Sequence, residues 1–174
     1  MNKLKTIYEK YKHIIPPLIY FPIYLIWFFW LEKNITKHYQ VIHVSWDDYV
    51  PFCEVFVIPY FLWFFYIAAV MIFFFFNNKQ DYYRCCTFLF TGMTIFLIVS
   101  TLWPNGHHLR LETMPRDNIF TRMIEGLWET DTATNLWPSI HVYNSIGCHF
   151  AVIRSEAFEK RNGIKIASFL LAAS

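Results

Sequence analysis

The sequence predicts an all-α, polytopic transmembrane helix bundle. Of its 174 residues, 56% are hydrophobic and 21% are aromatic, and the mean hydropathy is positive. A soluble domain of this length cannot bury so much apolar surface, so a lipid bilayer is the expected solvent. Long stretches contain no Asp, Glu, Lys or Arg, which is typical of helices that cross a membrane.

Five uncharged windows account for the predicted helices. Three of them can cross a hydrocarbon core of about 30 Å at about 1.5 Å per helical residue. The fourth also lacks charge, but it contains two histidines and several small polar groups. The fifth covers only 11 positions and predicts the beginning of a spanning helix, so we expect about five helices, the fifth incomplete. In order, the windows are 14–31, 55–76, 85–103, 136–153 and 164–174.

The first window follows four lysines and favours a retained signal anchor, because it is long, aromatic and lacks a small-x-small cleavage site. Before it, Leu4, Ile7, Tyr8 and Tyr11 share one face of a potential helix, opposite the lysines. This pattern predicts either a short helix lying on the membrane surface or a frayed basic tail.

The distribution of basic residues predicts the orientation. With a cytoplasmic N-terminus, ten of the fifteen Lys and Arg residues fall in inner segments and five in outer loops. Such a bias favours this topology. We therefore expect a multi-pass plasma membrane protein, of the bacterial cytoplasmic membrane type, with segment 104–137 outside the cytoplasm.

Residues 1–174 are expected to form one domain. The four cysteines lack the spacing of a zinc site, so no metal is expected.

Pro138, Ser139 and His141 mark the predicted start of the fourth helix. Proline is tolerated at a helix start and serine is a favoured N-cap, which places His141 in the first turn. Free backbone N–H groups and the positive end of the helix dipole gather at such a start. The site therefore suits an anionic group such as phosphate.

The fourth helix carries a polar stripe. Its members recur at spacings of three, four, seven and eight, and they are His141, Asn144, Ser145, Cys148 and His149. We expect this stripe to face the interior of the bundle, because polar groups at membrane depth are costly and often functional. The alternative interpretation is a hydrogen-bonded packing seam between helices.

Two arginines in the preceding loop, Arg110 and Arg116, are the candidate phosphate ligands together with Ser139. Guanidinium groups are permanently charged and can hold phosphate with two parallel hydrogen bonds. Taken singly, each arginine is more often a solvated loop charge, and the shared loop with a helix-start histidine makes them candidates.

At these residues the sequence resembles the type 2 phosphatidic acid phosphatase superfamily, which includes phosphotransferases of the inositol phosphorylceramide synthase kind. Its motifs are Lys-x6-Arg-Pro, Pro-Ser-x-His and Ser-Arg-x5-His-x3-Asp. Pro138, Ser139 and His141 match the second motif fully. Arg110 resembles the Arg of the first, whereas Leu111 replaces its Pro and Trp103 its Lys.

The resemblance implies six helices and a third motif that follows Ser174, where the nucleophilic histidine and its aspartate are expected. It also implies a metal-free, cofactor-free phosphoryl transfer in which His141 protonates the leaving group. The expected partners are membrane lipid and a lipid phosphate or diphosphate, such as phosphatidic acid or polyprenyl diphosphate, and no nucleic acid.

Three other functions stay open at this point. A head-group phosphotransferase would carry the same motif and pass the phosphoryl group to an alcohol in place of water. A transporter would use the polar stripe to line a path, although the first three windows offer only Pro22 and Pro59 as irregularities. A remnant protein would retain the motif without activity, consistent with the altered first motif.

Overall fold

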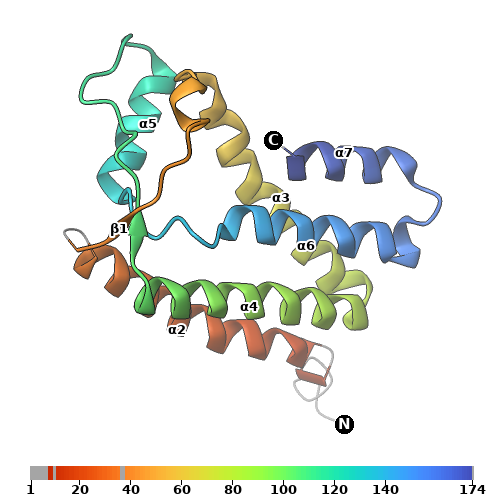
Figure 1. Ribbon diagram of the computed structural model, residues 1–174. Helices are drawn as coiled ribbons and strands as arrows, with labels where there is room; N and C mark the ends of the chain where they lie inside the picture. Colours follow the sequence, from red (N-terminus) through yellow and green to blue (C-terminus); the bar gives the residue numbers. More distant parts are fainter. Residues whose placement is uncertain (1–7, 10, 36–37, 174) are drawn as a thin grey trace.

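The computed structural model describes residues 8–9, 11–35 and 38–173, and it is almost entirely helical (Figure 1). Within this part of the chain, three helices are long and apolar enough to cross a membrane. They are α2 (Ile15–Asn34), α3 (Val57–Asn77) and α4 (Lys79–Leu102), and they confirm the first three windows as helices. The predicted surface helix rests on Leu4 and Ile7, which lie outside the described residues.

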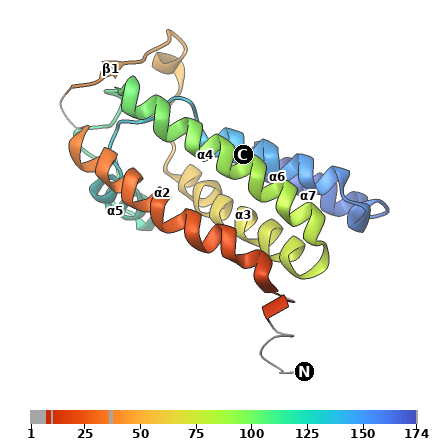
Figure 2. The ribbon, with the colours of Figure 1, turned by 90° about the horizontal axis from the view of Figure 1, so that it is seen from below.

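Helices α2 and α4 lie side by side along most of their lengths (Figure 2). The Tyr20 hydroxyl approaches the carbonyl of Phe90 at 3.0 Å and the Thr94 hydroxyl at 2.9 Å, and the Tyr20 and Phe90 rings stack at 4.1 Å. Asn78 alone connects α3 to α4, and its side chain accepts hydrogen bonds from two backbone amides of the first turn of α4. The turn between α3 and α4 is therefore tight.

Helix α6 (Ile140–Arg154) is shorter than the fourth window indicated. Its 15 residues extend about 22 Å, less than the hydrocarbon thickness of about 30 Å. The difference arises because residues 136–138 are not helical, although they carry no charge. The fourth window therefore contains the expected helix, which begins after Ser139 as predicted.

Helix α7 (Asn162–Ala173) folds back along α6 after the short helix η4 (Glu156–Phe158), and it confirms the fifth window as helical (Figure 1). Ser168 of α7 is buried and joins three helices. Its hydroxyl lies 2.7 Å from the Tyr66 hydroxyl of α3 and 3.0 Å from Nδ1 of His149. The end of the described chain is thus packed against the bundle.

The α4–α6 interface is built from two glycines, each facing an aromatic ring of the other helix. A Cβ atom at Gly92 would collide with the Tyr143 ring, and one at Gly147 would collide with the Phe88 ring. The two rings stack on each other with centroids 4.5 Å apart. Glycine lets the two helix backbones approach closely here.

The segments between the helices carry further structure that the sequence analysis did not predict. Strand β1 (Gln40–Val41) pairs in parallel with β2 (Asn105–Gly106), and Gly106 also bridges to Thr134. A Cβ on Gly106 would lie 2.6 Å from the Ala133 carbonyl oxygen, so only glycine fits. Short helices η1 (Lys12–Ile14), η2 (Asp47–Tyr49) and η3 (Glu54–Phe56) and helix α5 (Ile119–Thr130) complete the fold.

Candidate functional site

The candidate site lies at the amino end of α6, beside β1, β2 and the connection to α5 (Figure 1). Ser139 is the N-cap, and its hydroxyl accepts a hydrogen bond from the amide of Val142 at 3.3 Å. The helix start predicted at Pro138 and Ser139 is therefore confirmed. Because the first turn of a helix has N–H groups without intrahelical partners, this end can receive an anion.

Asn105 holds the residues that lead into α6. Its side chain is completely buried, donates hydrogen bonds to the carbonyls of Trp137 (2.7 Å) and Trp103 (3.2 Å), and accepts from the amides of Leu136 (3.0 Å) and Trp137 (2.8 Å). One side chain thus satisfies four backbone groups. This set of bonds fixes where α6 begins.

His141 is half-buried against α3. Its ring lies 4.3 Å from the Trp63 ring and 5.3 Å from the Tyr60 ring, measured between centroids. The Trp63 indole N–H points to the carbonyl of His141 (3.2 Å) and to the Ser145 hydroxyl (2.9 Å). Nε2 of His141 is buried and has no hydrogen-bond partner among the described residues. Such an atom has lost its hydration without compensation.

Arg110 packs against α5. Its guanidinium donates to the carbonyls of Asp131 (2.7 Å) and Trp128 (3.2 Å) and lies over the Trp128 ring. Burial lowers the pKa of Arg110, whereas the carboxyls of Asp131 and Glu32 and the Tyr60 hydroxyl act to raise it. Tyr60 also contacts the His141 ring, but no hydrogen bond or ring contact joins Arg110 to His141 in the described part of the chain.

Arg116 is bound elsewhere. Its guanidinium donates to the Glu54 carboxylate at 2.9 Å, and Asn118 donates to the same oxygen at 3.1 Å. Arg116 also lines a hollow of about 730 Å³ between residues 111–117 and α5, together with Arg122 and Trp128. No contact between Arg116 and His141 occurs in the described part of the chain. The structure therefore does not join Arg116 to the amino end of α6.

Glu32 is a member of the site that sequence reasoning missed. This carboxylate at the end of α2 is buried and accepts hydrogen bonds from the amide and hydroxyl of Thr132 and, at 2.9 Å, from the side-chain amide of Asn135. Burial raises the pKa of Asp131, the Glu32 charge acts in the same direction, and Arg110 opposes them. The buried Glu32 carboxylate therefore anchors Thr132 and Asn135 in the loop before α6.

The polar stripe of α6 faces the protein as expected. Asn144, Ser145 and Cys148 are buried, whereas His141 and His149 at its two ends are half-buried. On the opposite face, Val142, Ile146 and Phe150 are exposed, also as expected. Tyr143 differs, because its ring packs against α4.

In the described residues, no group of three or more His, Cys, Asp or Glu side chains could hold a metal ion. All four cysteines are free. Comparisons of the chain with models of protein families, with curated proteins and with solved structures found no match.

Proposed function

We propose that the chain is part of a polytopic membrane protein in which α2, α3 and α4 cross the bilayer. The support is physical: these helices are long and apolar, and many of their large hydrophobic side chains are exposed, such as Ile26, Phe65 and Ile72. In water these side chains would form an extended apolar surface, whereas lipid solvates them. The proposed orientation, with the amino end of α6 outside the cytoplasm, is supported by the excess of basic residues in the segments that it puts inside.

The proposed activity is phosphoryl transfer from a lipid phosphate to water, at the amino end of α6. The single observation that carries it is the buried, unpartnered Nε2 of His141 in the first turn of a helix that starts with Pro-Ser-x-His. A ring nitrogen in this position can hydrogen-bond a phosphate ester oxygen held at the helix start.

Each residue then has a defined role. In the mechanism that the resemblance implies, a nucleophilic histidine forms the N–P bond while the P–O bond to the lipid breaks. Protonated His141 gives its proton to the departing lipid oxygen. Ser139, the N–H groups of the first turn and Arg110 stabilise the charged phosphoryl oxygens. Arg110 can do so because its guanidinium has five N–H donors, and carbonyls accept hydrogen bonds from only two of its nitrogens. Water then hydrolyses the phosphohistidine.

Phosphate release from dioleoyl phosphatidic acid in detergent micelles, by the protein expressed from its complete gene, tests the proposal. We expect the His141→Gln variant to lose about a hundredfold or more in kcat, the range for loss of a general acid. His43→Gln is the matched control, because His43 bonds Asp48 in an exposed loop. Full activity of a correctly folded His141→Gln protein would remove His141 from the mechanism.

The same assay separates hydrolase from phosphotransferase. If the phosphoryl group or head group passes to an added acceptor alcohol without release of free phosphate, the protein is a transferase with the same site. If neither product forms with any lipid phosphate tested, the catalytic proposal is wrong and the transporter and remnant hypotheses are favoured.

A further inference from the structure

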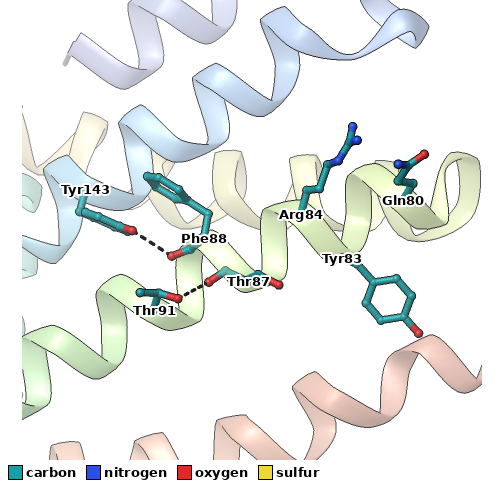
Figure 3. A pocket seen from close by; sticks show the side chains of 7 residues that line it. All are labelled: Gln80, Tyr83, Arg84, Thr87, Phe88, Thr91 and Tyr143. Carbon is teal, nitrogen blue, oxygen red and sulfur yellow. Dashed lines mark hydrogen bonds between the residues drawn. The ribbon is translucent and has the colours of Figure 1, made fainter.

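A groove runs along the first half of α4 and ends at Tyr143 of α6, two residues after His141 (Figure 3). Residues 80–91 of α4 and Tyr143 of α6 line it, and its volume is about 600 Å³. This size is within the range of small-molecule binding sites. The groove shares no residue with the proposed phosphoryl-transfer site.

The walls of the groove offer a hydrocarbon-like surface. Two polar side chains along it have partners: the Thr91 hydroxyl donates to the Thr87 carbonyl at 2.7 Å, and the Tyr143 hydroxyl donates to the Phe88 carbonyl at 3.1 Å (Figure 3). The Phe88 and Tyr143 rings stack and close one side. An acyl chain in the groove could pack against these two rings.

The mouth of the groove carries polar groups. Arg84 is 70% exposed and forms an ion pair with the Asp81 carboxylate at 3.6 Å, a distance too long for a hydrogen bond. The side chains of Gln80 and Tyr83 make no hydrogen bond to another described residue. In Figure 3, Arg84 and Gln80 extend beyond α4 on one side and Tyr83 points toward α2. Arg84 and Gln80 thus lie together on one side of α4, and Tyr83 lies on the other.

The length of the groove matches the depth of one leaflet. Residues 80–91 extend about 16 Å along α4, which is about half of a 30 Å hydrocarbon core. The surrounding end of the molecule is basic. Its described segments contain Lys12, Lys79, Arg84, Arg154, Lys160, Arg161 and Lys165, against the acidic residues Glu9, Asp81, Glu156 and Glu159.

From this combination we propose that the groove binds one anionic phospholipid of the membrane. Its phosphate lies at Arg84, with Gln80 as a neighbouring hydrogen-bonding group, and one acyl chain follows the groove past Phe88 to Thr91. With the N-terminus in the cytoplasm, this lipid belongs to the cytoplasmic leaflet, whose negative surface attracts basic segments. The proposal rests on the membrane placement and is independent of the phosphoryl-transfer chemistry.

Native mass spectrometry of the purified protein in a nonionic detergent can test this, with dioleoyl phosphatidylglycerol and dioleoyl phosphatidylcholine added separately. We expect the wild-type protein to bind phosphatidylglycerol at least fivefold more tightly. Arg84→Gln should abolish this preference, and Thr91→Phe, which fills the groove, should weaken binding of both lipids. Lys160→Gln is the control, because Lys160 is an exposed cation at the same end but does not line the groove.

Two outcomes would overturn the proposal. Equal effects of Lys160→Gln and Arg84→Gln would mean that charge acts diffusely and not at the groove. Unchanged binding in both Arg84→Gln and Thr91→Phe would mean that the lipid lies elsewhere on the protein. A His141→Gln variant should bind as the wild type does, which separates this site from the candidate phosphoryl-transfer site.

Discussion

At the residue scale, the start of α6 depends on Asn105. Replacing it with alanine leaves the amides of Leu136 and Trp137 and the carbonyl of Trp137 without their partners. An unsatisfied buried polar group costs about 1–3 kcal/mol. We therefore predict that Asn105→Ala lowers the free energy of unfolding by at least about 2 kcal/mol, measured by thermal or denaturant unfolding in detergent micelles.

Asn77→Ala is the matched control for this prediction. The Asn77 side chain is exposed and donates only to a carbonyl of its own helix, at 2.8 Å. Its loss should change stability by less than about 0.5 kcal/mol, as for most surface substitutions. If the two variants unfold alike, water replaces the lost partners of Asn105, and the buried network does not determine where α6 starts.

Single residues also show how far sequence alone could go at the site. Ser139 and His141 could be placed at a helix start because proline and an N-cap residue are local signals. Glu32 and Asn105 could not be found in this way. Their partners lie up to about a hundred positions away, and a polar residue at the end of an apolar window gives no indication of its tertiary contacts. Arg116 is a candidate only because it lies in the same loop as Arg110, and its position in a loop does not predict its ion pair with Glu54.

At the scale of elements, the α4–α6 contact depends on Gly92 and Gly147. A methyl group at Gly92 would displace the Tyr143 ring and weaken its hydrogen bond to the Phe88 carbonyl. Overpacking of this kind costs about 1–3 kcal/mol. We predict that Gly92→Ala lowers the unfolding midpoint of the protein in detergent, followed by circular dichroism.

Gly126→Ala is the matched control, because it adds the same methyl group but should not lower the stability of the protein. Gly126 lies within α5, and a Cβ there meets nothing within 4 Å. Alanine is the better helix former by about 1 kcal/mol, so this variant should be as stable as the wild type or more stable. If the unfolding midpoint of Gly92→Ala equals or exceeds that of Gly126→Ala, the close approach of α4 and α6 is contradicted.

The elements differ in how visible they are in the sequence. Helices α2, α3 and α4 follow from uncharged windows, because a long apolar run leaves few alternatives. Helix α5 was missed because it lies in a polar loop, yet its capping box of Asn118 and Thr121 and the apolar spacing of Phe120, Ile124 and Leu127 could have indicated it. Strands β1 and β2 have two residues each and show no detectable alternation.

At the scale of the whole molecule, the two ends carry different chemistry. The end with α5 and the amino end of α6 contains the buried network of Glu32, Asn105 and Arg110. The opposite end is basic and exposed around Arg84. If the bundle spans a membrane, this asymmetry puts the proposed phosphoryl-transfer site in one leaflet and the proposed anionic lipid in the other. Orientation therefore decides which leaflet supplies the substrate.

The native cysteines allow a direct measurement of that orientation. Cys53 is exposed beside Glu54 at the α5 end, whereas Cys85, Cys86 and Cys148 are buried. With the N-terminus in the cytoplasm, a membrane-impermeant maleimide should label the protein in intact cells, and Cys53→Ser should remove the labelling. Labelling that appears only after permeabilisation would reverse the topology and place His141 on the cytoplasmic side. Because a buried thiol reacts slowly whichever way the protein is inserted, the signal reports the location of Cys53 alone.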